Sequence, residues 1–329
     1  MEDPKHINAD KYTFYRDVRP MAVIGKVLGI FSLQNVMQSD GRRLKHTLFS
    51  FDALWGPIFI GVLPAPLIEY EKDDFGRYWR IMQVLRGFIT VSLSSYYDAS
   101  LPEMISKMET LGVVLRSLNT KNTVANNINR HARITGFVCV CGSILFVSVN
   151  TFVEMVIKGE PFLRLMVHLY GTLNLIPRQV YVVMYVFFCY NMILLVRDMQ
   201  NCWKEQVNKI LQEDDNTIGS VEQLENVRLI HVELIRAIRL LNKAYGARMA
   251  FYLATIFIEV LLDLYIYFFY NNYSYIQLEY HTFNAVTFYM LTSVTDKLTY
   301  AVSILRLNHL HLVLFNPLKT KRRPLYLTH

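Results

Sequence analysis

Long apolar runs, separated by charged connectors, constrain the fold of this chain more than any other feature. The chain has 329 residues, 53% of them hydrophobic. The hydrophobic residues are clumped into runs of roughly 18 to 24, the length that a helix needs to cross ~30 Å of hydrocarbon. We therefore expect an all-α, polytopic membrane protein with about six transmembrane helices. We place these helices at residues 49–68, 80–97, 134–157, 177–197, 249–270 and 284–305.

The lysines and arginines outside these runs predict an orientation. One alternating set of connectors, which includes both chain ends, holds 25 of them, and the other set holds four. Connectors that are rich in Lys and Arg stay in the cytoplasm, so both termini are predicted to lie inside. The predicted domains are a cytoplasmic segment 1–48, a transmembrane domain 49–305 and a basic cytoplasmic tail 306–329. The sequon at Asn272 falls in a predicted outer connector, where it is a candidate glycosylation site.

Two stretches outside the spans are predicted to be helical. Residues 21–36 are short and contain Lys26, so we expect an interfacial or half-inserted helix within the N-terminal segment, with a spanning helix as the alternative. Residues 198–248 carry apolar side chains at helical spacing on both sides of a turn at 213–220. The fourth and fifth helices should therefore project into the cytoplasm as a pair.

Motifs of enzymes and cofactors are missing from the sequence. It contains no glycine-rich phosphate loop, no His-Glu-x-x-His, no Gly-x-Ser-x-Gly and no Cys-x-x-Cys. His309 and His311 are two positions apart and would point to nearly opposite sides of a helix, which argues against a metal site. The basic residues form no stripe with interleaved aromatics, which argues against nucleic-acid binding. We expect no enzyme activity, no cofactor, no metal and no nucleic-acid partner.

Charged residues inside the predicted spans are the strongest functional signal. Glu259 and Asp263 are four positions apart, so they share one face of the fifth span. Burying a carboxylate in the bilayer costs at least ~2.5 kcal/mol. Arg86, in the second span, should lie at the depth of Asp263 and could pair with it. The acidic residues either fix helix packing through such a pair, or they line a water-filled cavity that takes a polar ligand or passes cations.

Tyrosines in the fourth and fifth spans allow two interpretations. Tyr181, Tyr185 and Tyr267 could anchor the protein at the membrane interface, or they could line a ligand pocket together with convergent polar groups. The candidate ligand-binding residues are Arg86, Tyr181, Tyr185, Glu259, Asp263 and Tyr267.

Several short motifs point to a family. The stretch "LLNKAYGARM" opens the fifth span, and "FYRDVRPMAVIGKVLGIFSL" near the amino terminus contains Pro20 and Gly29 at family-like positions. With the predicted layout, these motifs make the chain similar to the insect gustatory receptors. Thr299 and Tyr300 match the start of the closing motif of that family. The chain departs from the motif at Arg306-Leu307, where the family has Gln-Phe.

The resemblance implies a ligand-gated, non-selective cation channel with seven helices and no G-protein coupling. It implies a plasma-membrane homo- or hetero-tetramer that contacts membrane lipid, with a pocket for a tastant, either a sugar or a bitter compound, between the outer helix halves. Because the closing motif falls in our sixth span, either this is a degenerate last span and an earlier span is missed, or the seventh helix is absent. The pattern of Lys and Arg favours absence, since both termini then lie inside. We therefore expect the chain not to conduct alone. The alternative function is a secondary transporter or a modulatory membrane subunit that uses the intramembrane acidic pair.

Overall fold

The computed structural model describes residues 14–27, 29–38, 41–47, 50–58, 74–118, 142, 149, 152–153, 175–212, 217–270 and 284–305. Helices dominate these residues, and the predicted all-α fold is confirmed. The helices are α1 (Phe14–Val27), α2 (Phe51–Pro57), α4 (Asp74–Tyr97), α5 (Leu101–Leu118), α8 (Leu175–Gln212), α9 (Thr217–Tyr270) and a last helix over 284–305. The short elements are β1 (Leu33–Gln34), β2 (Lys45–His46) and the 3-10 turns Gly41–Arg43 and Asp98–Ser100.

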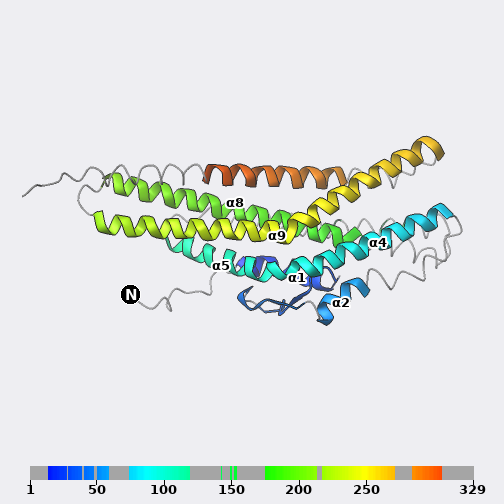
Figure 1. Ribbon diagram of the computed structural model, residues 1–329, viewed down its shortest axis with the longest axis horizontal. Coiled ribbons are helices and arrows are strands. Elements are labelled where there is room, and N and C mark those ends of the chain that lie inside the picture. The colour runs from blue at the N-terminus through cyan, green and yellow to red at the C-terminus, as the bar shows by residue number, and fades with distance from the viewer. Residues whose placement is uncertain are drawn as a thin grey trace, which may run out of the picture.

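Two long helices, α8 and α9, lie side by side and organise the molecule (Figure 1). The 54 residues of α9 make a helix about 80 Å long, far more than a bilayer needs. Both helices run without a break through residues 198–212 and 217–248, so the predicted helical extension is confirmed as helix. Of the other predicted spans, most of 134–157 and most of 49–68 lie outside the described residues.

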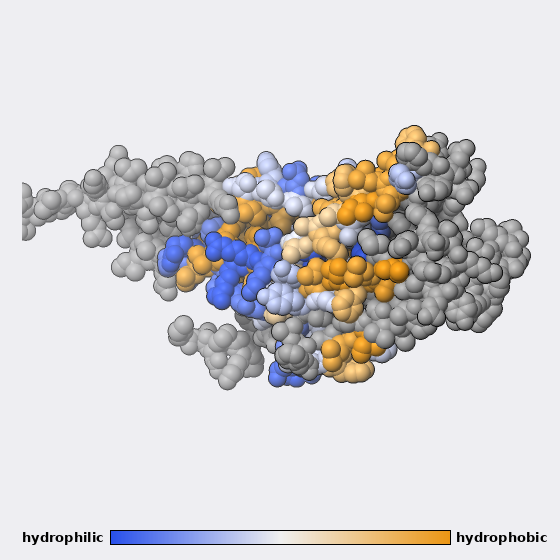
Figure 2. Space-filling view, turned by 45° about the vertical axis from the view of Figure 1, so that its right-hand side comes forward, coloured by the Kyte–Doolittle hydropathy of each residue, from blue (hydrophilic) through white to orange (hydrophobic). Residues whose placement is uncertain are grey.

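Two described helices are long and apolar enough to cross a membrane, Val180–Gln206 in α8 and Glu225–Leu262 in α9. Their environments differ, because 67% of the apolar window of the first is buried inside the protein but only 33% of the second. The C-terminal part of α9 exposes large apolar side chains, as does α4: Phe257, Ile258, Leu261, Phe268, Ile81, Leu85 and Phe88. Residues 217–248 instead expose arginines such as Arg236 and Arg239. On the coloured part of the surface in Figure 2, hydrophilic residues gather on the left and hydrophobic residues on the right. The lipid-facing region therefore lies around 80–97 and 249–270.

The register of α8 differs from the predicted one. The predicted spans 177–197 and 249–270 would lie at one depth, but the ring of Tyr181 packs 4.9 Å from the ring of Tyr245, near the inner end of the fifth span. The start of α8 thus lies beside the part of α9 that has a polar surface. Burial within protein accounts for the apolar run of α8 in the same way that burial in lipid would.

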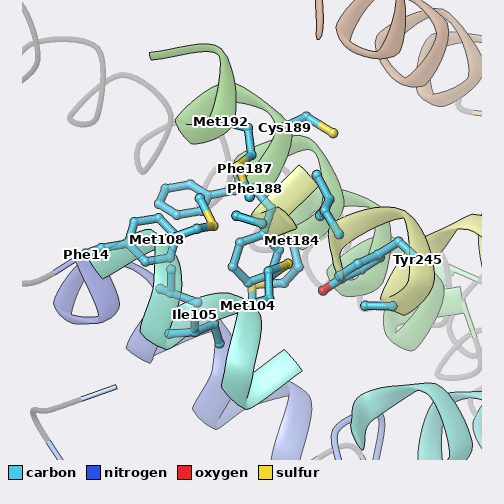
Figure 3. Packing of buried hydrophobic residues seen from close by; sticks show 14 of the residues in the cluster. Phe14, Met104, Ile105, Met108, Met184, Phe187, Phe188, Cys189, Met192 and Tyr245 are labelled. Atoms are coloured by element: carbon cyan, nitrogen blue, oxygen red, sulfur yellow. The ribbon is translucent and has the colours of Figure 1, made fainter. Parts of the chain in front are cut away.

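The core lies where α1, α5, α8 and α9 meet. Phe14, Met104, Met108, Phe187 and Phe188 converge there (Figure 3), and all five are buried. The ring centroids of Phe14 and Phe188 are 6.0 Å apart. Helix α5 was missed by the sequence analysis, although its buried side chains recur at helical spacing, at Leu101, Met104, Ile105, Met108 and Leu115.

Residues 14–58 contain α1, β1, β2 and α2. We call this part of the chain the N-terminal module. The predicted helix at 21–36 is wrong in its bounds, because α1 begins at Phe14 and ends at Val27. Gly29 has a φ of +70°, a conformation that terminates helices and suits glycine. The chain then turns into β1, which pairs antiparallel with β2. Gly29 lies against Gly56 of α2 so closely that a Cβ on either glycine would collide with the other.

Candidate functional site

The first buried ion pair joins α4 to α9 inside the lipid-facing region. The guanidinium of Arg86 contacts the carboxylate of Glu259, and both side chains are largely buried. Pairing lowers the cost of holding either charge away from water. Arg86 therefore has its partner one helical turn away from the predicted one, Asp263, whose side chain lies outside the described residues. The interpretation of the acidic residues as partners in a helix-packing ion pair fits Glu259.

A second buried ion pair lies at the end of the lipid-facing region, where the surface of α9 becomes polar. Nη2 of Arg248, in α9, donates a hydrogen bond of 2.7 Å to Oδ1 of Asp98. The side chains are only 2% and 0% exposed, respectively. The backbone N–H and the hydroxyl of Ser32 both donate to Oδ2 of Asp98, at 2.9 and 3.1 Å. The carboxylate thus accepts three hydrogen bonds, which offsets much of the cost of its burial.

Aromatic rings surround the guanidinium of Arg248. Its Cζ atom lies 4.8 Å from the ring centroid of Tyr181 and 5.8 Å from those of Tyr97 and Tyr245. These distances are within the range of cation–π attraction. We call Ser32, Tyr97, Asp98, Tyr181, Tyr245 and Arg248 the inner hub, because the predicted orientation puts them toward the cytoplasm.

The inner hub joins four segments that are far apart in the chain. Asp98 lies in the 3-10 turn directly after α4, Tyr181 near the start of α8, Arg248 in α9 and Ser32 just before β1. Figure 1 shows α9 bending along its length, so that its C-terminal part diverges from α8. The hub therefore couples the lipid-facing helices to the bundle that α1, α5, α8 and the N-terminal part of α9 form.

The helix over 284–305 attaches to α8. The hydroxyls of Tyr185 and Thr295 share a hydrogen bond of 3.3 Å, and the side-chain amide of Gln200 donates to the carbonyl of Ala301 at 3.4 Å. Thr299 donates back to the carbonyl of Thr295 in its own helix, and Tyr300 is exposed. Both residues that match the family motif are thus exposed.

The predicted ligand-binding residues form two groups rather than one. Arg86 and Glu259 are paired, whereas Tyr181 and Tyr185 lie at the level of Tyr245. Arg248 and Glu259 are 11 residues apart, which corresponds to about 16 Å along α9. The side chains of Asp263 and Tyr267, and Asn272 as a whole, lie outside the described residues.

Sequence reasoning missed both members of the hub ion pair. Asp98 and Arg248 each lie one position outside a predicted span, so the argument from charges inside the spans did not include them. The sequence does contain a signal. Asp98 directly follows the span 80–97, and Arg248 directly precedes the span 249–270, at span ends that are predicted to lie on the same side of the membrane. Within the part of the chain that the structure describes, no group of three His, Cys, Asp or Glu residues is arranged to hold a metal ion.

Comparison with known proteins identifies the family. No curated protein matches the chain. The family model described as 7tm Chemosensory receptor matches residues 18–305. That range contains both buried ion pairs and every helix from α2 to the last one, and the match agrees with the resemblance to insect gustatory receptors. The chain therefore belongs to the 7tm chemosensory receptor family, whose members are membrane proteins and not generally enzymes.

Proposed function

We propose that this chemoreceptor is a plasma-membrane subunit of a ligand-gated, non-selective cation channel that detects a small-molecule tastant. The observation that carries the proposal is the Arg86–Glu259 pair, which joins two helices inside the lipid-facing region of a chemosensory-receptor chain. An intramembrane ion pair marks a functional site by default, because isolated charges are too costly to keep there. Other subunits of the same family would complete the channel, as a homo- or hetero-tetramer.

The pair suits two classes of tastant. The ammonium of a bitter alkaloid would compete with Arg86 for the carboxylate of Glu259. The hydroxyls of a sugar could donate to Glu259 and accept from Arg86 at once. Either ligand would favour a state in which α4 and α9 separate, and the equilibrium would shift by its differential affinity for the two states.

The route from the pair to the rest of the molecule is short. Glu259 and Arg248 belong to one continuous helix, α9. The tip of Arg248 donates to Asp98, whose carboxylate also accepts from Ser32. A displacement of α9 at Glu259 would therefore also move Arg248 and strain its contacts in the inner hub. Through the hub it would reach α8 and the N-terminal module.

The test is voltage clamp of oocytes that express the chain alone and together with other subunits of the family. The applied compounds are sucrose, fructose, quinine and denatonium. We expect a cation current evoked by at least one of them. We expect Glu259→Gln and Arg86→Gln to shift its concentration dependence while surface expression persists. The matched control is Glu225→Gln, an exposed residue of α9, which should leave the response unchanged.

Three outcomes would contradict the proposal. The absence of an evoked current in every combination of subunits would contradict the proposed channel function. Solute uptake without current would favour the transporter alternative. Loss of surface expression in both Glu259→Gln and Arg86→Gln would assign the pair to helix packing instead of ligand binding.

A further inference from the structure

The N-terminal module encloses a cavity that neither buried ion pair uses. Its volume is about 400 Å³. It lies between α1, the β1–β2 hairpin and α2, and most of its lining is apolar. The apolar lining residues are Val23, Val27, Val36, Met37, Phe51 and Trp55.

The cavity opens onto an exposed apolar surface. Val27 and Met37 are each 66% exposed, and Phe51 is 73% exposed. A cluster of exposed large apolar side chains marks a surface that binds either another protein segment or lipid. Trp55 lies beside them and donates from Nε1 to the carbonyl of Val27 at 3.1 Å. A tryptophan with its ring in an apolar cleft and its N–H satisfied is typical of a membrane interface.

One cation lines the cavity, and two more lie on the hairpin that borders it. Lys26 contributes to the cavity wall. Arg43 and Lys45 are exposed on the far arm of the hairpin whose turn carries Val36 and Met37. Over residues 14–58 the sequence holds six Lys and Arg against three Asp and no Glu. A lipid with a net negative headgroup therefore fits this surface better than a zwitterionic one.

The depth of the module also favours lipid. Ser32, next to β1, is bonded to Asp98, which directly follows the lipid-facing helix α4. That boundary belongs to the connectors rich in Lys and Arg, which the orientation rule places on the cytoplasmic side. The cytoplasmic leaflet is the one that carries anionic lipid.

We propose that this cavity is a binding site for one anionic phospholipid of the cytoplasmic leaflet. Its acyl chain lies along Val27, Met37 and Phe51, and its headgroup pairs with Lys26, with Arg43 and Lys45 at the rim. Because the cavity borders the Gly29–Gly56 contact and the segment that leads to Ser32, the bound lipid also supports the inner hub.

The test uses Trp55 as the reporter in the full-length chain. Trp79→Phe and Trp203→Phe leave Trp55 as the single tryptophan. The purified protein is placed in phosphatidylcholine vesicles that contain equal fractions of brominated phosphatidylserine or brominated phosphatidylcholine. We expect stronger quenching by brominated phosphatidylserine. One basic residue near an anionic surface changes lipid preference about fivefold, so Lys26→Gln should reduce the preference by about that factor. Lys26→Arg should retain it.

Lys204→Gln, an exposed site on α8, is the matched control and should leave quenching unchanged. Equal quenching by the two brominated lipids would overturn the anionic site, since apolar contact alone would explain it. Absence of quenching by either lipid would overturn it too, because another protein segment or a second copy would then cover the cavity. If Lys26→Gln does not fold, the effect of added salt on quenching is measured instead in the parent protein, which has Trp55 as its single tryptophan. Salt should weaken the preference for phosphatidylserine, and a preference that salt leaves unchanged would overturn the proposal.

Discussion

Asp98 and Arg248 are 150 positions apart in the sequence, yet they share a hydrogen bond of 2.7 Å in the protein interior. The pair ties the end of α4 to α9 at the level where the lipid-facing surface gives way to a polar one. A buried pair of this kind adds little net stability by itself, but removal of one partner leaves the other charge uncompensated. The pair should therefore fix the geometry of the inner hub.

The first prediction concerns this pair. Arg248→Met should destabilise the protein by ~3–5 kcal/mol, because Asp98 would remain buried without its counter-charge. Thermal denaturation of the detergent-solubilised protein, followed by size-exclusion chromatography, measures the loss.

The control is Arg228→Met, which breaks the exposed pair with Glu225 and should leave the thermal midpoint nearly unchanged, because solvent screens exposed charges. The double variant Asp98→Leu with Arg248→Met should recover much of the lost stability. A double variant as unstable as the sum of its single variants would show that the two charges are not coupled.

Long helices were predictable from the sequence because their signal is local. All residues of the helix predicted at 284–305 are helical, and the span predicted at 249–270 ends where α9 ends, at Tyr270. The span predicted at 80–97 also ends where α4 ends, at Tyr97, because the apolar run stops there. An apolar run of this length has few other stable solutions.

The register of α8 and the inner hub were not predictable in the same way. A helix buried in protein and a helix buried in lipid have similar composition, so hydropathy could not tell where α8 lies along α9. The hub depends on contacts between residues that are separated by more than a hundred positions, such as Asp98 and Arg248. Pattern analysis within a single window does not reach such contacts.

The second prediction concerns the contact between Gly29 and Gly56. Gly56→Ala should destabilise the N-terminal module, because the added methyl would collide with the carbonyl of Gly29 and the side chain of Val91. Overpacking of this kind costs ~1–3 kcal/mol. Gly142→Ala is the control, since a Cβ there meets nothing among the described residues within 4 Å. Comparison of the thermal midpoints of the two variants checks the prediction, and equal midpoints would contradict it.

The third prediction concerns α5, which packs against α1, α8 and α9. Met108 is fully buried, so Met108→Ala should cost ~2–5 kcal/mol through lost burial and a cavity. Val113→Ala on the exposed side of the same helix should be nearly neutral. The thermal midpoint in detergent reports both changes. A loss of stability from Val113→Ala as large as that from Met108→Ala would show that α5 presents its other face to the protein.

The fourth prediction concerns the pH dependence of the N-terminal module. The hydroxyl of Tyr15 donates a hydrogen bond of 2.8 Å to the carbonyl of Val36. Burial raises the pKa of Tyr15 from 10.0 to about 12, since an ionised phenol would lose its hydration and this donor.

The sign of the effect follows from linkage. A folded-state pKa above the unfolded value means that folding favours the protonated phenol, so its contribution is complete below pH 10 and declines as the pH rises through about 12. Tyr15→Phe removes the hydrogen bond and the titration together. The wild type should therefore be more stable than Tyr15→Phe by ~0.5–1.5 kcal/mol at neutral pH. The difference should shrink toward zero, or change sign, as the solution becomes strongly alkaline. Chemical denaturation of both proteins across the alkaline range measures the difference, and a constant gap would show that Tyr15 titrates no differently in the folded and unfolded chains.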